Sequence, residues 1–274
     1  MESVQISGLS IAIMAFAVLF SLALPLVPYF ILRKKIKARF VPVLIGAATF
    51  IVSALILERI VHGLVLGDAN IYAYLMKNPM LYALYAGLMA GLFEESGRFG
   101  AFKLMRKKYS TSSDALSYGL GHGGIEAVIV LGLSMVSNIV LSLMANSGAL
   151  NSTLAVLPAQ QKEVLVASVN TLAAAQPAEF FVGMIERVGA LAFHVGASVL
   201  VYLAATRQAS FWLYPLAVLL HLLLDFPAGL FQAGVITSIW LIEAIVIVFS
   251  GLVLWFALKL LRAADNRLAV VREE

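Results

Sequence analysis

The stretch Leu92-Phe93-Glu94-Glu95-Ser96-Gly97-Arg98 places two adjacent carboxylates and a guanidinium inside a run from Met80 to Met105 that is otherwise almost wholly apolar. Ionisable groups at bilayer depth cost about 3 kcal/mol each, so a chain that keeps three together is expected to use them. In a helix, Arg98 lies four residues after Glu94 and three after Glu95, and can therefore reach either acid. The other acid is then free, and we expect Glu94 or Glu95 to be a catalytic base.

The composition is that of a membrane protein. Of 274 residues, 62% are hydrophobic and 12% are charged, whereas soluble domains carry about 25% charged residues. The long apolar runs predict an all-α polytopic membrane bundle rather than a β-barrel. We expect a single integral membrane domain over residues 1–274, with its motifs in about 80–231. The net charge of +4 does not indicate nucleic acid, and the absence of cysteine excludes disulfides, thiolate nucleophiles and Cys-ligated metals.

Seven apolar stretches are long enough to cross a bilayer. They cover about residues 7–32, 40–64, 80–105, 114–145, 177–205, 211–231 and 235–261, with a loop at 67–79. A surface-lying helix or a lid is expected near 158–175. With the N-terminus outside, fourteen Lys and Arg residues fall at inner ends and only Lys77 and Lys162 in outer loops. This asymmetry predicts an outer N-terminus and a cytoplasmic C-terminus, in what we expect to be a bacterial inner membrane. The chain starts Met1-Glu2 with no basic region before the apolar run, so the first span is expected to stay uncleaved.

All four histidines fall within predicted spans. His122, His194 and His221, together with Glu95, lie roughly 12–18 Å from the inner boundary at 1.5 Å per residue. Four helices therefore place an acid and three imidazoles in one layer of the membrane. His62 lies near the outer end of the second span.

Two of these histidines have a carboxylate one helical turn later. His122 and Glu126 form H-x-x-x-E, and His221 and Asp225 form H-x-x-x-D. Such a pair can present two ligands to one metal, or one ligand and a carboxylate that orients a neighbouring imidazole. Four glycines between residues 119 and 124 permit close backbone approach around His122.

Structural interpretations compete with these functional ones. His62 pairs at helical spacing with Glu58 and is typical of a hydrogen-bonded packing residue. Glu186 and Arg187 are most simply an ion pair that supports the site, since Arg187 lies seven residues before His194 and hence on a similar face. The whole set could also be a polar packing network.

The pattern suits attack of water on an amide, which needs a base and stabilisation of the oxyanion. A divalent metal supplies much of both. Four side chains match the nitrogen and oxygen ligands of zinc, namely His122, Glu126, His194 and His221. Glu94 or Glu95 would then take the proton of the water, and a metal-free version with the same glutamates stays open. H-E-x-x-H and G-x-S-x-G are absent, which argues against an ordinary zincin or a serine hydrolase.

These motifs resemble a known group of proteins. Glu94-Glu95-Ser96-Gly97-Arg98 resembles the double-glutamate motif of the CAAX-protease and bacteriocin-processing (CPBP) group of intramembrane proteases. Tyr118-Gly119-Leu120-Gly121-His122 is similar to the second motif of that group, and Phe193-His194 and His221-Leu222-Leu223-Leu224-Asp225 to its third and fourth. The H-G-G-I-E motif from His122 to Glu126 resembles more closely that of the YhfC branch of intramembrane metalloproteases and its PrsW relatives.

The resemblance covers about half of the chain and implies hydrolysis of a peptide bond within or beside the membrane. The spacing here is E-E-x-x-R rather than the E-E-x-x-x-R of the CAAX proteases, so prenylated substrates are not implied. Glu126 is an addition to the pattern of those enzymes, which leaves the metal open. The expected partners are a membrane protein or peptide substrate and the lipid bilayer, with no nucleic acid and with homo-oligomerisation left open.

Three other functions use the same kinds of residues. An ion-coupled or metal transporter would line its pathway with intramembrane acids and histidines. A di-haem electron carrier would use four histidines as axial ligands. A membrane scaffold would need only the polar packing network.

Overall fold

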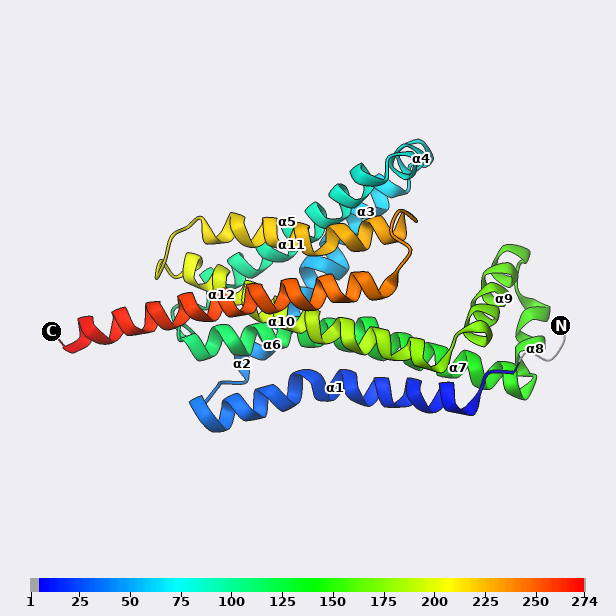
Figure 1. Cartoon of the computed structure of the whole chain (residues 1–274), viewed down its shortest axis with the longest axis horizontal. Helices are drawn as coiled ribbons and strands as arrows, with labels where there is room; N and C mark the ends of the chain where they lie inside the picture. The colour runs from blue at the N-terminus through cyan, green and yellow to red at the C-terminus, as the bar shows by residue number, and fades with distance from the viewer. Residues whose placement is uncertain (1–4, 274) are drawn as a thin grey trace. The chain divides into compact units, whose positions relative to one another are not determined.

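The computed structural model describes residues 5–273, and within them it forms helices joined by short turns, without a β-strand (Figure 1). Six helical stretches are long and apolar enough to cross a membrane. They are Gly8–Ile36, Val41–Leu66, Ser112–Ser147, Pro177–Ala205, Leu213–Gln232 and Ile239–Val270. The predicted all-α membrane bundle is therefore confirmed, and the chain is a multi-pass membrane protein.

The third predicted span, about residues 80–105, coincides with helix α5, Pro79–Met105, which has 27 residues. At 1.5 Å per residue it is about 40 Å long, enough for a bilayer. Its ionisable residues lower its hydropathy, and it is not among the six apolar stretches. A membrane crossing by α5 stays a prediction.

Two of the six stretches are interrupted by π-helix. Val41–Leu66 consists of α2 (Val41–Phe50), the π-helical η1 (Ile51–Glu58) and α3 (Arg59–Leu66). Ser112–Ser147 consists of α6 (Ser112–Ala127), the π-helical η2 (Val128–Leu133) and α7 (Ser134–Ser147). A π turn holds an extra residue and changes which side of the helix faces inward. The apolar sequence gave no sign of either interruption.

The helices fall into two compact units, one with the residues up to Leu24 and Ala127–Arg187, the other with Pro25–Glu126 and Val188–Glu274. A single domain over the whole chain stays a prediction. The first unit contains α8 (Ala149–Val156), which the sequence analysis missed, and α9 (Ala159–Ala174), which confirms the helix expected near 158–175. Val169 and Leu172 of α9 pack in a core with Ile6 and Met14, while a surface-lying position of α9 stays a prediction.

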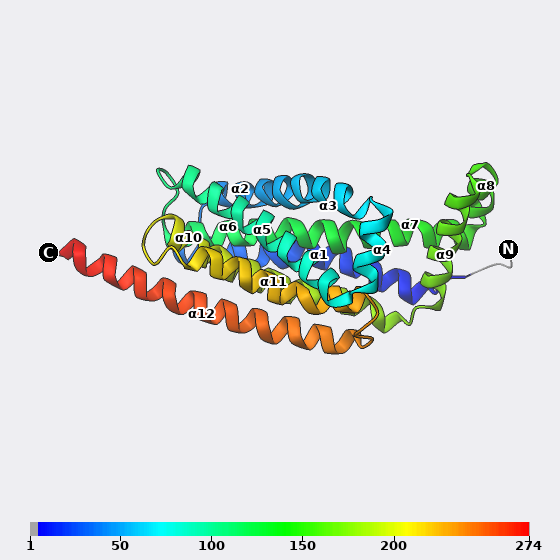
Figure 2. The same ribbon diagram turned by 90° about the horizontal axis from the view of Figure 1, so that it is seen from above.

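In the second unit, α5 lies along α11 (Leu213–Gln232) in both views (Figures 1 and 2). Two glycines of α5 allow this. A Cβ added at Gly87 would lie 2.7 Å from the carbonyl oxygen of Leu222, and one added at Gly91 would lie 2.7 Å from that of Val218. The backbones therefore touch, one turn before the acid pair of α5 and beside His221 of α11.

The prediction of a loop at residues 67–79 is wrong. The structure has a nine-residue helix there, α4 (Ala69–Lys77). The carboxylate of Asp68 accepts hydrogen bonds from the backbone N–H groups of Asn70 (2.8 Å) and Ile71 (3.1 Å). Asp68 is the N-cap of α4, and Asn78 lies between the end of α4 and the start of α5. Polar residues that are typical of a loop in the sequence therefore mark the ends of helices here.

Helix α6 touches α2 through glycine as well, and this contact gives a stability prediction. A Cβ at Gly121 would overlap the backbone carbonyl of Val43, whereas a Cβ at Gly100 of α5 would have no atom within 4 Å. We expect Gly121→Ala to lower the free energy of unfolding by about 1–3 kcal/mol through overpacking. Gly100→Ala should be neutral or slightly stabilising, because alanine is the better helix former. Thermal unfolding of the two purified variants checks this, and equal melting temperatures would contradict it.

Candidate metal and catalytic site

Four helices of the second unit bring their intramembrane ionisable side chains to one place. The group comprises Glu94, Glu95 and Arg98 of α5, His122 of α6, His194 of α10 (Val182–Ala205) and His221 of α11, all of them buried. The ring centroids of His122 and His194 lie 5.0 Å apart, and those of His194 and His221 lie 5.6 Å apart. The structure thus places the predicted acid pair and three imidazoles in one cluster.

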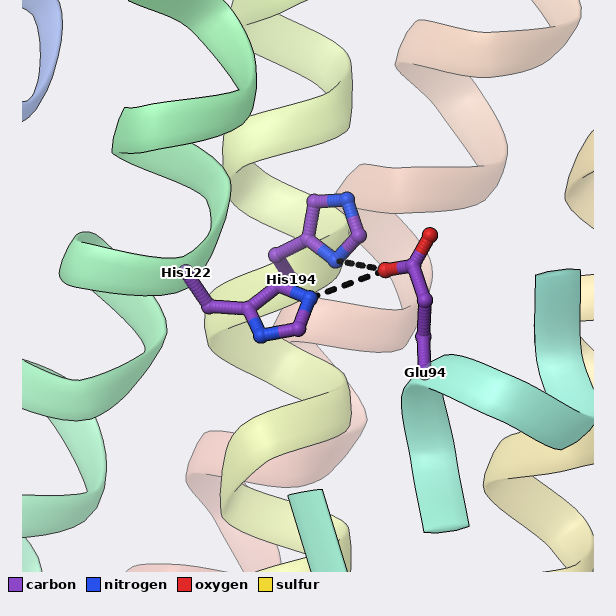
Figure 3. A group of neighbouring side chains, drawn as sticks. All are labelled: Glu94, His122 and His194. Atoms are coloured by element: carbon purple, nitrogen blue, oxygen red, sulfur yellow. Dashed lines mark hydrogen bonds and ion pairs between the residues drawn. The ribbon is translucent and has the colours of Figure 1, made fainter. Parts of the chain in front are cut away.

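One carboxylate oxygen, Oε2 of Glu94, is the centre of this cluster. It lies 2.8 Å from Nε2 of His122 and 3.9 Å from Nδ1 of His194 (Figure 3). The three atoms lie within 4.8 Å of one another, and these residues could hold a metal ion. Ligands about 2.0–2.1 Å from a tetrahedral metal are about 3.3 Å apart, a value between the two observed distances. Small side-chain shifts would bring the three donor atoms to this spacing, and a metal at Nδ1 of His194 would also take the lone pair that this nitrogen now offers to Arg98.

Both ring nitrogens of His194 have partners that fix the imidazole. Its Nε2 pairs with the Glu126 carboxylate, and its Nδ1 lies 3.1 Å from Nη2 of Arg98. Because a guanidinium only donates, Nδ1 is an acceptor here, and the proton of the ring lies on Nε2 and is donated to Glu126. A carboxylate on the far nitrogen is the usual arrangement that orients a metal-binding histidine. Glu126 thus contacts His194 rather than the His122 one turn away on its own helix.

Arg98 also fixes the backbone around His194. Its Nη1 donates to the carbonyl oxygen of His194 and to Oγ of Ser198, each at 2.8 Å. The Ser198 hydroxyl donates in turn to the carbonyl of His194 at 2.6 Å. The sequence analysis did not single out Ser198, although a serine one turn after an intramembrane histidine was a usable signal.

Glu95 is held by two partners. Its Oε1 lies 2.8 Å from Nδ1 of His221 and its Oε2 lies 3.2 Å from Nε of Arg98. The other nitrogen of His221, Nε2, lies 3.5 Å from Oδ2 of Asp225 and 4.0 Å from Oε1 of Glu94. The adjacent acids therefore differ in surroundings, since Glu95 is fixed by the guanidinium and Glu94 faces the histidines.

Aromatic rings hold the imidazoles from outside. Phe50 of α2 meets His122 edge-on with centroids 5.3 Å apart, and Phe193 meets His221 edge-on at 5.0 Å. These rings fix the imidazoles without competing for their nitrogens. In the described part of the chain, Nδ1 of His122 has no hydrogen-bond partner, so the ring is oriented by its Nε2 contact with Glu94 and by packing.

Two further predicted groups have contacts of their own. His62 bonds to Glu58 at 3.0 Å and to the Tyr85 hydroxyl at 2.8 Å. Arg187 belongs to the first unit, where its guanidinium pairs with Glu186. The supporting role of Arg187 stays a prediction, as do the chemical roles of the clustered residues.

Comparison with known proteins identifies a family and a curated relative. The model of a family described as "YhfC intramembrane metalloprotease" matches residues 20–246. A curated protein of Bacillus subtilis (strain 168), described as "Uncharacterized membrane protein YhfC", is 36% identical over 244 residues, which cover 89% of this chain and 92% of the relative. No solved structure matches. The matched region contains every residue of the cluster.

Proposed function

Because the chain belongs to the YhfC intramembrane metalloprotease family, we propose that it hydrolyses a peptide bond in a membrane-embedded or membrane-adjacent polypeptide. The observation that carries the proposal is the buried group of Glu94, His122 and His194, whose ligand atoms converge. Three protein ligands of nitrogen and oxygen type leave a coordination position open for water or substrate, as in catalytic zinc sites. Zinc is the proposed metal.

The ligand set proposed here differs from the one suggested by the sequence. In the proposed set, Glu94 is the third ligand beside His122 and His194. His221 and Glu126, which the sequence suggested as ligands, are not part of it. Glu126 orients His194 through its far nitrogen, where a lost partner typically costs 10- to 100-fold in metal affinity. Arg98 positions His194 and Glu95 through the contacts described above.

The residues around the metal position perform the proton transfers. A bound metal would polarise the substrate carbonyl and activate water. Glu94 takes a proton from the attacking water at Oε1, the oxygen that faces His221, while the hydroxyl adds to the carbonyl carbon. The proton passes to Nε2 of His221 and then to the amide nitrogen as the C–N bond breaks. The products are one carboxylic acid and one amine, with the water fully accounted for.

The contacts of His221 suit this transfer. Glu95 lies at its Nδ1 and Asp225 at its Nε2, so each nitrogen has a carboxylate partner. A ring held from both sides keeps its orientation as its protonation changes.

The charge asymmetry along the chain supports an outer N-terminus, an inner-membrane location and a site opening toward the cytoplasmic leaflet.

Metal analysis of purified protein tests the ligand set. We expect about one zinc ion per chain in the wild type, since three ligands are in place. His122→Ala and His194→Ala should each weaken binding by at least the roughly 10- to 100-fold that a lost supporting residue costs. His221→Ala should keep the metal and lose cleavage of a membrane-embedded reporter peptide.

His62→Ala is the matched control, because His62 is an intramembrane histidine outside the group. It should keep both metal and activity. Equal metal loss in His62→Ala and His122→Ala, or wild-type metal in all variants, would contradict the proposed ligands. Metal uptake into proteoliposomes without cleavage would favour a transporter instead.

A further inference from the structure

A large groove of the second unit lies outside the site. Its volume is about 1280 Å³, and its walls are the helical stretch from Ile45 to Val61 and one face of α5 from Met89 to Met105. None of its lining residues is acidic, and apolar or small side chains predominate. Glu94, Glu95 and Arg98 are absent from this lining and lie on a buried face of the same helix. The groove is therefore a separate feature of α5.

The lining suits hydrocarbon rather than a polar chain. Three hydroxyls of the groove already have partners, since Thr49 donates to the carbonyl of Ile45, Ser53 donates to that of Thr49, and Ser96 lies 2.7 Å from the Tyr214 hydroxyl. Met89 and Met105 are sixteen positions apart on α5, which makes this wall about 24 Å long at 1.5 Å per residue. One leaflet contributes about half of the roughly 30 Å hydrocarbon core. An acyl chain that starts at one end of the groove would find an apolar wall along its whole leaflet.

One end of the groove is basic. Lys107 and Lys108 line it, followed by Tyr109, which also lines a neighbouring cavity of about 480 Å³. That cavity contains Arg33, Lys37 and Arg39 and has no acidic lining residue. Cations thus gather at the end of the groove that the charge distribution places at the inner membrane surface.

Arg39 ties the two cavities together. It forms a two-point ion pair with Asp114, donates to the carbonyl oxygen of Lys108 at 3.0 Å, and lies 4.7 Å above the Tyr109 ring. The hydrogen bond that Arg39 donates to Asp114 raises the pKa of Arg39, so this guanidinium stays charged. Arg39 is a fixed part of the wall, and the lysines remain to meet an anion.

We propose that this groove binds an anionic diacyl phospholipid, with its chains along α5 and its phosphate at Lys107 and Lys108. The match of charge at one end and hydrocarbon along the rest carries the inference, since juxtamembrane lysines attract anionic headgroups. A polypeptide helix is the competing occupant, because Ser96 and Gly100 are small residues one turn apart. The cations gathered at one end of an otherwise apolar groove favour the lipid, because a phospholipid has a phosphate for them to meet and an apolar helix has none. The inference does not depend on the proposed proteolysis.

Lipid retention by the full-length protein in detergent tests the headgroup end. Native mass spectrometry with dioleoylphosphatidylglycerol or dioleoylphosphatidylcholine should show the wild type retaining the anionic lipid preferentially. The Lys107→Gln/Lys108→Gln variant should reduce that preference about tenfold. The matched control Lys34→Gln/Lys35→Gln removes two exposed cations of the same side that line neither cavity, and should retain it. Equal losses in the two double variants would overturn the proposal.

Blocking the groove tests where the chains lie. Cβ atoms at Gly100 and Gly251 would each meet nothing within 4 Å, and only Gly100 lines the groove. Gly100→Trp should abolish preferential retention, whereas Gly251→Trp should leave it intact. A photo-crosslinking amino acid at position 100 in intact membranes should form a phospholipid adduct. Protein adducts without lipid adducts, or unchanged retention in Gly100→Trp, would overturn the assignment.

Discussion

Replacement of Glu94 by glutamine is expected to lower kcat for peptide hydrolysis by about 100- to 10,000-fold, the range that general acid–base groups contribute. The amide keeps the size of the side chain and one carbonyl oxygen near His122 and His194. It can no longer accept the proton of the attacking water. The variant should therefore fold and keep part of its metal while its turnover is lost. Cleavage of a membrane-embedded reporter peptide in reconstituted vesicles measures the effect.

Two further glutamines complete this test. Glu163→Gln changes an exposed carboxylate on α9 and should leave kcat unchanged. Glu95→Gln should reduce stability more than chemistry, because Glu95 is occupied by Arg98 and His221. If Glu95→Gln abolished turnover and Glu94→Gln retained it, the assignment of the base would be reversed.

Replacement of Arg98 by methionine is expected to lower the free energy of unfolding by about 3–5 kcal/mol, the usual cost of removing one partner of a buried ion pair. Arg98 is wholly buried and contacts Glu95, His194 and Ser198. Methionine fills a similar volume but leaves the Glu95 carboxylate without its cation. Denaturant unfolding of purified protein in detergent measures the change.

A second substitution separates charge from packing. The Arg98→Met/Glu95→Gln variant removes the stranded charge and should recover part of the loss, giving a coupling energy in a double-mutant cycle. Arg106→Met removes an exposed arginine at the end of α5 and should change stability by less than about 0.5 kcal/mol. Full additivity of the two buried substitutions would contradict a direct interaction.

That the ionisable residues of the buried cluster lie together was predictable, because such groups in an apolar chain have few partners other than one another. The spacing of Glu95 and Arg98 allowed their ion pair, and the depth of the three histidines placed them in one layer. The roles of the two adjacent acids were not predictable. They depend on Arg98 turning toward Glu95, which follows from its contacts with His194 on another helix.

The fold, too, has features that were predictable from the sequence and features that were not. Apolar length alone predicted the spans, and helical spacing predicted α9. The π segments η1 and η2 were not predictable, because an all-apolar stretch carries no periodicity to mark an extra residue in a turn. Helix α4 was missed because the polar Asp68 caps a helix rather than starting a loop. Gly121 looked merely permissive in sequence, and only the position of Val43 makes it a close contact.

X-ray absorption at the zinc edge of the purified wild type tests the central claim most directly. We expect a stoichiometric ion with nitrogen and oxygen ligands at about 2.0–2.1 Å, outer-shell scattering from two imidazoles, and loss of one imidazole signal in His122→Ala. A protein that cleaves peptide without stoichiometric metal, or a zinc spectrum unchanged by His122→Ala and His194→Ala, would contradict a metal site formed by Glu94, His122 and His194.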